Sequence, residues 1–255
     1  MKRLLFFVKP QCIAALLIAI SIPCKLFAVD ITVGASTWYS WWDQKSWNKD
    51  GKTGHTTNFD PTFFYGPALS VKFADDFNAT LVYLYAKFEV EEKSGFEKTT
   101  IKHKRTDADL ALNYRLNNYF KIFAGAKYMP YESSGSNSSG TSKSDHSGLG
   151  PGFGVSCTYP VLDNLFVLGT LSGFYLWSSE DFSSSISGKD YTHDYKRYGF
   201  NSTLAFAYYI AEISTTISLG GRLQYYKSDY NYEKVDYIDN MFYGVTLTAT
   251  YSFAI

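Results

Sequence analysis

Cysteine is scarce in this sequence. There are three cysteines in 255 residues, and Cys12 and Cys24 fall in an N-terminal stretch that we expect to be removed. The third, Cys157, would then have no partner, which excludes a small secreted scaffold held together by internal disulfides. Because Cys157 alternates with Val155 and Tyr159, we interpret it as a small hydrophobic side chain rather than a reactive thiol.

Long hydrophobic runs are also rare. The one apolar run, residues 12–22, follows the basic residues Lys2, Arg3 and Lys9 and is shorter than the roughly 20 residues of a spanning helix. With Ala28 at a plausible cleavage point, residues 1–28 have the pattern of a secretory signal peptide. Residues 29–255 contain no run long enough for a membrane helix, so we expect them to form one domain that is not a helical membrane protein.

Neither sign of charge is in excess. The chain has 24 basic and 24 acidic residues, and loss of the signal peptide would leave 20 against 24, a net charge of −4. Nucleic-acid binding therefore has no electrostatic support. The four histidines are isolated, with no metal-ligand spacing, and the sequence has no glycine-rich phosphate loop or nucleophile motif, so we expect neither a metal nor a cofactor.

Aromatic residues, in contrast, are abundant. In the last stretch of the sequence they belong to an alternating pattern of apolar and polar residues. Across residues 239–255, odd positions are mostly large and apolar, whereas even positions are mostly small or hydroxylated. The odd set includes Met241, Tyr243, Val245, Leu247, Tyr251, Phe253 and Ile255, and the even set includes Gly244, Thr246, Thr248, Thr250 and Ser252. Such long alternation exceeds the usual strand of about 5 or 6 residues and suits a wall with lipid on one side and a lumen on the other.

Nine further segments have strand patterns, and the connections alternate in length. The ten segments are 30–42, 63–73, 77–91, 99–116, 119–131, 152–159, 165–178, 191–209, 213 to about 225, and 239–255. Turns near residues 75, 117, 163 and 211 are tight, whereas those near 50, 94, 140, 185 and 233 are longer, and we expect the polar segment 132–148 to be a mobile loop. This asymmetry predicts an all-β fold, a closed antiparallel up-and-down transmembrane β-barrel of ten strands with eight as the alternative, and both termini on the periplasmic side of a bacterial outer membrane.

Aromatic residues near the strand ends predict two girdles at the edges of the bilayer. On the predicted girdle we place Trp38, Trp41, Trp42 and Trp177 toward the longer loops and Phe253 toward the short turns. The membrane lipid is then the first partner of this chain.

Charged residues on the face opposite the apolar one are expected to line the lumen. This set is Lys72, Lys87, Glu89, Asp107, Asp109, Arg115, Lys121, Lys127 and Arg222. Inside a narrow barrel, charges must be paired or hydrated, so a network of salt bridges and water is the first interpretation, and a weakly anion-selective pore is the alternative. We also place Leu81, Tyr83 and Tyr85 on the lumen side, with packing favoured over an apolar path.

Three short motifs carry a family resemblance. The ending with Tyr251, Phe253 and Ile255 resembles the C-terminal signature of bacterial outer-membrane barrels, although Ile255 replaces the usual Phe. Together with residues 38–42 (WYSWW) and 150–154 (GPGFG), the pattern is similar to small opacity-type and OmpW-like barrels. The resemblance implies a surface-exposed barrel, assembled by the barrel-assembly machinery through its C-terminal strand, that passes or binds small apolar solutes.

Ten strands also resemble the architecture of omptin-type outer-membrane proteases, which use an acidic pair and an Asp/His couple. Asp107 with Asp109 and His193 with Asp194 are the candidates, but they lie at different heights on their strands, and adjacent residues point to opposite faces. We therefore expect no enzyme. We expect a narrow porin-like or small-solute-binding barrel; the alternative is a structural or adhesive protein whose external loops contact host surface molecules.

Overall fold

A computed structural model describes residues 30–50, 53–94, 97–137, 140–185, 188–230 and 235–254, so the predicted signal peptide lies outside the described residues. Nearly all of the described chain is β-strand. The strands are β1 (Asp30–Asn48), β2 (Thr53–Ala74), β3 (Phe77–Ser94), β4 (Glu97–Arg115), β5 (Phe120–Tyr128), β6 (Tyr131–Asn137), β7 (Gly140–Leu162), β8 (Leu165–Ser184), β9 (Lys189–Ile210), β10 (Thr215–Asp229) and β11 (Val235–Ala254). One 3-10 turn, η1 (Ala211–Ile213), joins β9 to β10. Among the described residues, no helix has the length and apolar content to cross a membrane.

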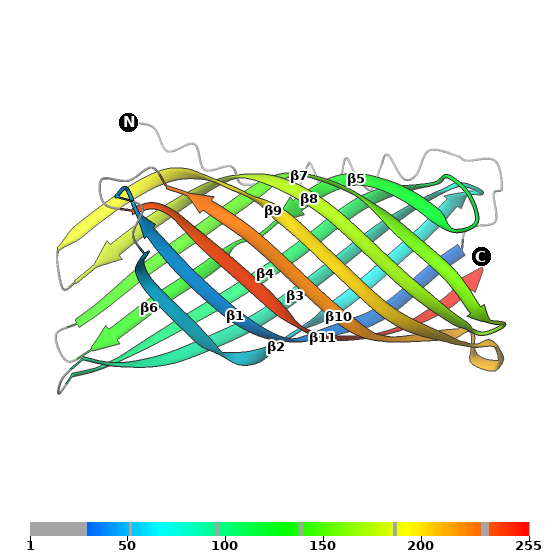
Figure 1. Cartoon of the computed structure of the whole chain (residues 1–255), viewed down its shortest axis with the longest axis horizontal. Coiled ribbons are helices and arrows are strands. Elements are labelled where there is room, and N and C mark those ends of the chain that lie inside the picture. The colour runs from blue at the N-terminus through cyan, green and yellow to red at the C-terminus, as the bar shows by residue number, and fades with distance from the viewer. Residues whose placement is uncertain are drawn as a thin grey trace.

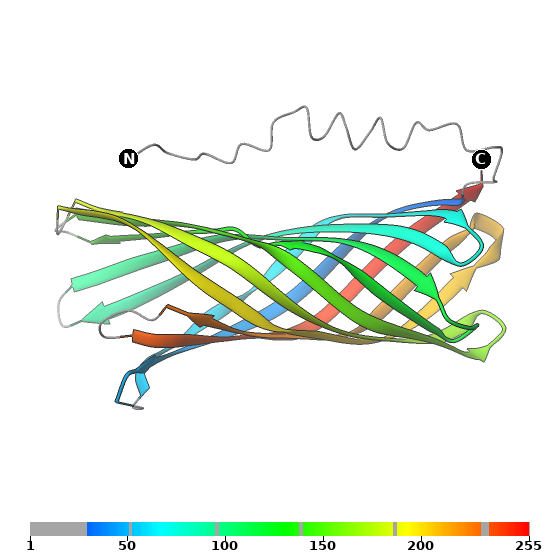
Figure 2. The same cartoon turned by 90° about the horizontal axis from the view of Figure 1, so that it is seen from above.

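The strands close into a ring of 10, as predicted (Figures 1 and 2). Each wall strand pairs antiparallel with its neighbour in sequence, and the ring closes where β1 pairs with β11, from Asp30 opposite Ala254 to Asn48 opposite Val235. Since β5 and β6 both lie between β4 and β7, they are two parts of one wall strand. The start of β1, the end of β11 and the tight turns all lie at one end of the barrel, which we call the short-turn end.

Pro130 explains the interruption between β5 and β6. Proline has no backbone N–H and cannot donate to the ladder. The neighbouring groups still pair across the gap, because Thr106 N donates to Pro130 O at 3.0 Å and Met129 N donates to Gly148 O at 2.8 Å. The wall therefore continues past the interruption without a hole in its hydrogen bonding at these positions.

Alternation decides which face of each strand forms the outer wall. On β11, Tyr243, Val245 and Leu247 are 36%, 48% and 44% exposed, whereas Phe242 and Thr246 are buried on the interior side. The same two-residue period holds on β4, where Leu110 and Leu112 face outward and Asp107 faces inward. The outer wall is therefore apolar through the middle of the barrel, as a lipid-facing surface requires.

Two aromatic girdles border this apolar belt. At the short-turn end Phe77 contacts both Phe73 and Tyr114, at 6.3 and 4.9 Å between ring centroids. Toward the other end Trp41 stacks on Tyr243 at 5.8 Å, and exposed Trp177 contacts Tyr175 at 5.5 Å. On β11 the girdles lie at Tyr243 and Tyr251. The length of strand from one to the other is close to the roughly 9–11 residues that a tilted strand needs to cross a bilayer.

Trp38 and Trp42 were predicted on the girdle, and this prediction is wrong. They are 0% and 3% exposed and point into the barrel, because they have the parity of Ser40 rather than that of Trp41. The other predicted girdle residues do not share this position inside the barrel. Trp41 and Trp177 are exposed on the outer wall, and Phe253 stacks on Tyr251 at the short-turn end.

The segment 132–148 was predicted as a mobile loop, and the structure shows otherwise. Its residues extend the wall as β6 and the first part of β7, which pair from Tyr131 opposite His146 to Asn137 opposite Gly140. β4 and β8 flank this hairpin, so its backbone groups find partners without burying apolar area. We call the girdle farther from the short-turn end the upper girdle. Several other strands also run well past it, so the predicted long loops are shorter than expected, and these strand extensions together with β6 and the first part of β7 form what we call the collar (Figure 1).

Candidate functional site

The lumen changes character along the barrel axis, and at the level of the upper girdle it is filled by a plug. We define the plug by its fully buried charged core, Arg105 and Asp107, and by the aromatic side chains around it. Nε and Nη2 of Arg105 donate to the two carboxylate oxygens of Asp107 at 3.0 and 3.2 Å, and Nη2 also donates to Oε1 of Gln224. Gln224 Nε2 in turn donates to Asp107 at 3.1 Å, so the carboxylate is held from two strands.

Lys127 joins the plug to a second carboxylate. Its ammonium group lies 3.0 Å from Asp109 Oδ1 and 3.5 Å from Asp107 Oδ2, and its side chain is 2% exposed. Buried charges are tolerated when they are paired and hydrogen-bonded in this way. The sequence placed Asp107, Asp109 and Lys127 on the lumen face, and the structure brings these three together.

Aromatic rings complete the plug. Trp42 stacks between Phe59 and Phe242, with centroid distances of 3.8 and 4.9 Å, and Trp38 stacks on Phe64 at 5.0 Å. The Arg105 guanidinium lies 3.9 Å from the centre of the Phe242 ring, a cation–π contact. All of these rings are buried, so side chains rather than water occupy the lumen at this height.

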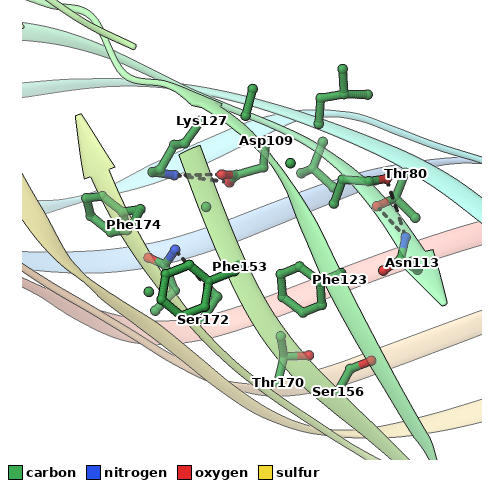
Figure 3. Close-up of a pocket in the computed structure, with 18 of the residues that line it drawn as sticks. Thr80, Asp109, Asn113, Phe123, Lys127, Phe153, Ser156, Thr170, Ser172 and Phe174 are labelled. Carbon is green, nitrogen blue, oxygen red and sulfur yellow. Dashed lines mark hydrogen bonds and ion pairs between the residues drawn. The ribbon is translucent and has the colours of Figure 1, made fainter. Parts of the chain in front are cut away.

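Below the plug, toward the short-turn end, the lumen widens into an inner cavity of about 380 Å³ (Figure 3). Its wall combines hydroxyl and amide groups with a few rings. The lining includes Thr80, Asn113, Phe123, Ser156, Thr170, Ser172, Phe174, Asn201, Thr203 and Arg222. This volume lies in the range of about 300–1,000 Å³ typical of small-molecule pockets.

The inner cavity continues toward a polar mouth at the short-turn end. Successive interior residues of the same strands line the two spaces, such as Ser156 then Thr158 and Thr80 then Asn78. Two salt bridges border the mouth, Lys72 with Asp30 at 3.5 Å and Arg115 with Asp76 at 3.0 Å. Lys121, another predicted lumen residue, also lines this mouth.

Above the plug, inside the collar, lies an outer vestibule of about 280 Å³. Tyr131 stacks on His146 at 3.8 Å, His146 Nδ1 lies 3.0 Å from the Tyr195 hydroxyl, and the Tyr131 and Tyr230 hydroxyls are 3.4 Å apart. Arg197, fully buried beneath, donates to Met129 O at 2.8 Å and to the Tyr195 hydroxyl. The vestibule is thus walled by stacked rings that share hydrogen bonds.

Burial disfavours the charged forms of His103, His146 and Glu180 in the vestibule. It lowers the pKa of His103 to about 4, and burial together with the nearby Arg197 and His103 holds the pKa of His146 well below its usual value. Burial also raises the pKa of Glu180, whose carboxylate lies 3.7 Å from His146 Nε2. Within the described part of the chain, no group of three or more His, Cys, Asp or Glu residues could hold a metal ion.

Lys87 and Glu89 were predicted to line the lumen, and the structure corrects this. Both are exposed on the outer wall of β3, alternating with the buried interior residues Ala86 and Phe88. Glu89 lies 3.5 Å from Lys102 of β4, a surface pair above the girdle. The same correction applies to Leu81, Tyr83 and Tyr85, which belong to this outward set.

Sequence reasoning missed several interior residues that matter most. Arg105, Gln224 and Arg197 are each fully or almost fully buried in the lumen. A signal was available for the first two, because Arg105 has the parity of Asp107 on β4 and Gln224 has the parity of Arg222 on β10. Their contact across the barrel depends on strand stagger, which periodicity does not reveal.

The residues considered for a protease are not brought together. Asp107 is buried in the plug, where it accepts hydrogen bonds from Arg105 and Gln224. His193 lies in the vestibule with its Nε2 at 2.6 Å from Tyr230 O. Asp194 is exposed on the opposite face of β9. The acidic pair and the Asp/His couple therefore do not share one cavity.

Neither a protein-family model nor a curated protein matches the sequence. Among solved structures, the outer-membrane protease OmpT from Escherichia coli matches with a TM-score of 0.61 and 12% identity, over 91% of this chain and all of that one (100%). The fold is that of an outer-membrane β-barrel. Looser likenesses are to the P. putida toluene transporter TodX (TM-score 0.36, 10% identity, 91% of each chain) and a major outer membrane protein from Thermus thermophilus (0.38, 13%, 89% of this chain and 100% of that one). At these identities the likeness concerns the barrel fold alone.

Proposed function

We propose that this chain is an integral protein of the bacterial outer membrane that binds a small solute in its lumen, on the inner side of a closed plug. The short turns and both termini face the periplasm in this proposal, and the collar faces outward. The apolar belt with its two girdles and the likeness in fold to outer-membrane barrels support the location. The protein acts by binding and is not an enzyme.

The observation that carries the proposal is the contrast between the two halves of the lumen. Arg105 and Asp107 sit at 2% and 1% exposure among stacked rings, whereas the cavity below offers about 380 Å³. A barrel of about ten strands has an interior that side chains can fill or that can hold one small ligand. A filled upper half argues against the open porin-like channel, and a roomy lower half supports solute binding.

Filling the cavity tests the proposal. Thr170→Trp places a large ring in the inner cavity and should abolish binding of small solutes, measured by titration of the purified protein in detergent against a panel of neutral and charged compounds. Leu171→Trp is the matched control, because Leu171 is 54% exposed on the lipid-facing side of the same strand. Wild-type protein should show no steady conductance in planar bilayers. An open-channel conductance, or solute binding that survives Thr170→Trp, would overturn the proposal.

An adhesive role is the second candidate, and the collar supports it. The outer side of the β6–β7 hairpin and its neighbours carries polar pairs such as Lys104 with Glu132 at 3.1 Å and Lys143 with Asp145 at 2.8 Å. Because this surface is pleated wall rather than loop, any host molecule would meet a fixed pattern of charge. Neutralising Lys104, Glu132, Lys143 and Asp145 together should then abolish attachment of cells displaying the protein; unchanged attachment would remove this candidate.

A further inference from the structure

Arg222 lines the inner cavity and, unlike Lys127, forms no salt bridge with any described carboxylate. It projects from β10 into the cavity, with its guanidinium carbon 4.6 Å from the centre of the Trp38 ring. Its Nε is buried, and no described residue accepts a hydrogen bond from it. The residues beside Arg222 on the neighbouring strands are Thr203 and Gly244, which carry no charge.

The carboxylates of the middle of the lumen, Asp107 and Asp109, are paired with other residues. Asp107 accepts from Arg105 and Gln224 and lies within ion-pair distance of Lys127, and both oxygens of Asp109 accept from Lys127. The middle of the lumen therefore holds three cations, Arg105, Lys127 and Arg222, against these two carboxylates. A local excess of positive charge with a buried, unsatisfied Nε is unfavourable, so this place favours a guest of negative charge.

The rest of the cavity shows what else the guest should carry. Thr203, Ser172 and Asn201 offer hydroxyl and amide groups beside Arg222, and Asn201 Oδ1 is buried without a described partner. Phe123 and Phe174 provide apolar surface in the same cavity (Figure 3). A charged end and an apolar body are thus both accommodated.

We propose that the inner cavity binds a small monocarboxylate with an apolar body, its carboxylate on Arg222 and its body beside Phe123 and Phe174. A guanidinium presents paired N–H donors that match the two oxygens of a carboxylate, and such charge-assisted hydrogen bonds are stronger than neutral ones. This inference rests on the proposed function and assigns the chemical class of its ligand. The same geometry disfavours a cationic guest.

Benzoate and benzamide form a suitable probe pair, because they share size and ring and differ in charge. Titrated into the purified wild-type barrel, benzoate should bind roughly 10- to 100-fold more tightly than benzamide, the ratio expected for a hydrogen bond to a charged group. Binding can be followed by isothermal calorimetry and by the intrinsic tryptophan fluorescence, to which Trp38 against Arg222 contributes. Arg222→Gln should abolish the preference.

Lys121→Gln is the matched control, since it removes a lumen cation from the mouth rather than from the cavity. It should leave the preference for benzoate intact. Unheated electrophoresis, on which folded barrels migrate anomalously, checks that each variant is folded. Equal binding of both probes, in wild type and Arg222→Gln alike, would overturn the ligand class and leave solute binding standing. Absence of binding by either probe up to high millimolar concentration would overturn both proposals.

Discussion

Asp107→Asn should destabilise the barrel far more than the same change at Asp76. In the plug, Asp107 is 1% exposed and is shared by Arg105 and Lys127, so its neutralisation leaves buried positive charge uncompensated. Removing one partner of a buried ion pair costs about 3–5 kcal/mol. Asp76 pairs with Arg115 at the mouth, where the side chains are 48% and 43% exposed, and solvent screening limits such a pair to about 0–1 kcal/mol.

Equilibrium urea unfolding of the folded protein in detergent, followed by tryptophan fluorescence, measures both values. A third variant separates charge from packing. Arg105→Met with Asp107→Leu removes both members of the pair and leaves Lys127 with Asp109, so it should be less destabilising than Asp107→Asn alone. If Asp107→Asn costs no more than Asp76→Asn, the plug is hydrated, and the view of it as a dry seal fails.

The plug, the vestibule and the closing strands each give one more prediction. Arg105→Ala with Phe242→Ala removes bulk from the plug while Asp107 keeps Lys127, so steady conductance should appear in planar bilayers; a silent double variant would mean that other rings suffice to close the lumen. Burial lowers the pKa of His103 from 6.5 to about 4, so as the pH falls the unfolded chain takes up this proton before the folded chain does. The free energy of unfolding should therefore decrease between about pH 6.5 and pH 4, by about 3 kcal/mol at most. His103→Gln should reduce this decrease, measured as the urea midpoint against pH, and an unchanged slope would contradict the assignment. Gly244→Ala should lower the folded yield on unheated gels, since its Cβ would lie 1.9 Å from Tyr39 O between the closing strands, whereas Gly221→Ala meets only ordinary contact at 3.9 Å and should fold normally.

The barrel itself could be predicted because the outer and inner faces of a membrane-barrel wall carry opposite polarity, so that neighbouring residues alternate. β11 from Tyr243 onward and β4 from Asp107 onward show this contrast. On β3 the contrast disappears, because interior Leu84 and Phe88 pack in the same buried cluster as the plug's rings and are as apolar as outward Leu81. Periodicity then gives no sign of direction, and Lys87 was placed on the wrong face.

The errors at Trp38 and in the collar have different physical origins. A tryptophan near a strand end is typical of a girdle, but Trp38 has the parity of the lumen face and fills the narrow lumen by stacking on Phe64. For residues 132–148 the composition rule assumes that order requires apolar burial. Here the existing wall acts as a template, and backbone pairing with β4 and β8 is enough.

The candidate site was only partly predictable. Parity could place Asp107, Lys127 and Arg222 in the lumen, but no local pattern reveals which of these charges meet. Pairing across the barrel depends on stagger and on which rings displace water. That the described residues offer Arg222 no salt bridge is therefore a property of the assembled ring and not of any single strand.

The position of the plug also decides which compartment the cavity samples. The inner cavity is closed by the plug on one side and open at the mouth on the other. With the short turns in the periplasm, as proposed, the occupancy of this cavity would follow the concentration of solute in the periplasm. Molecules in the surrounding medium would influence it only during rare rearrangements of the seal. In the proposed orientation, such a barrel would exchange its solute with the periplasm rather than conduct it across the membrane.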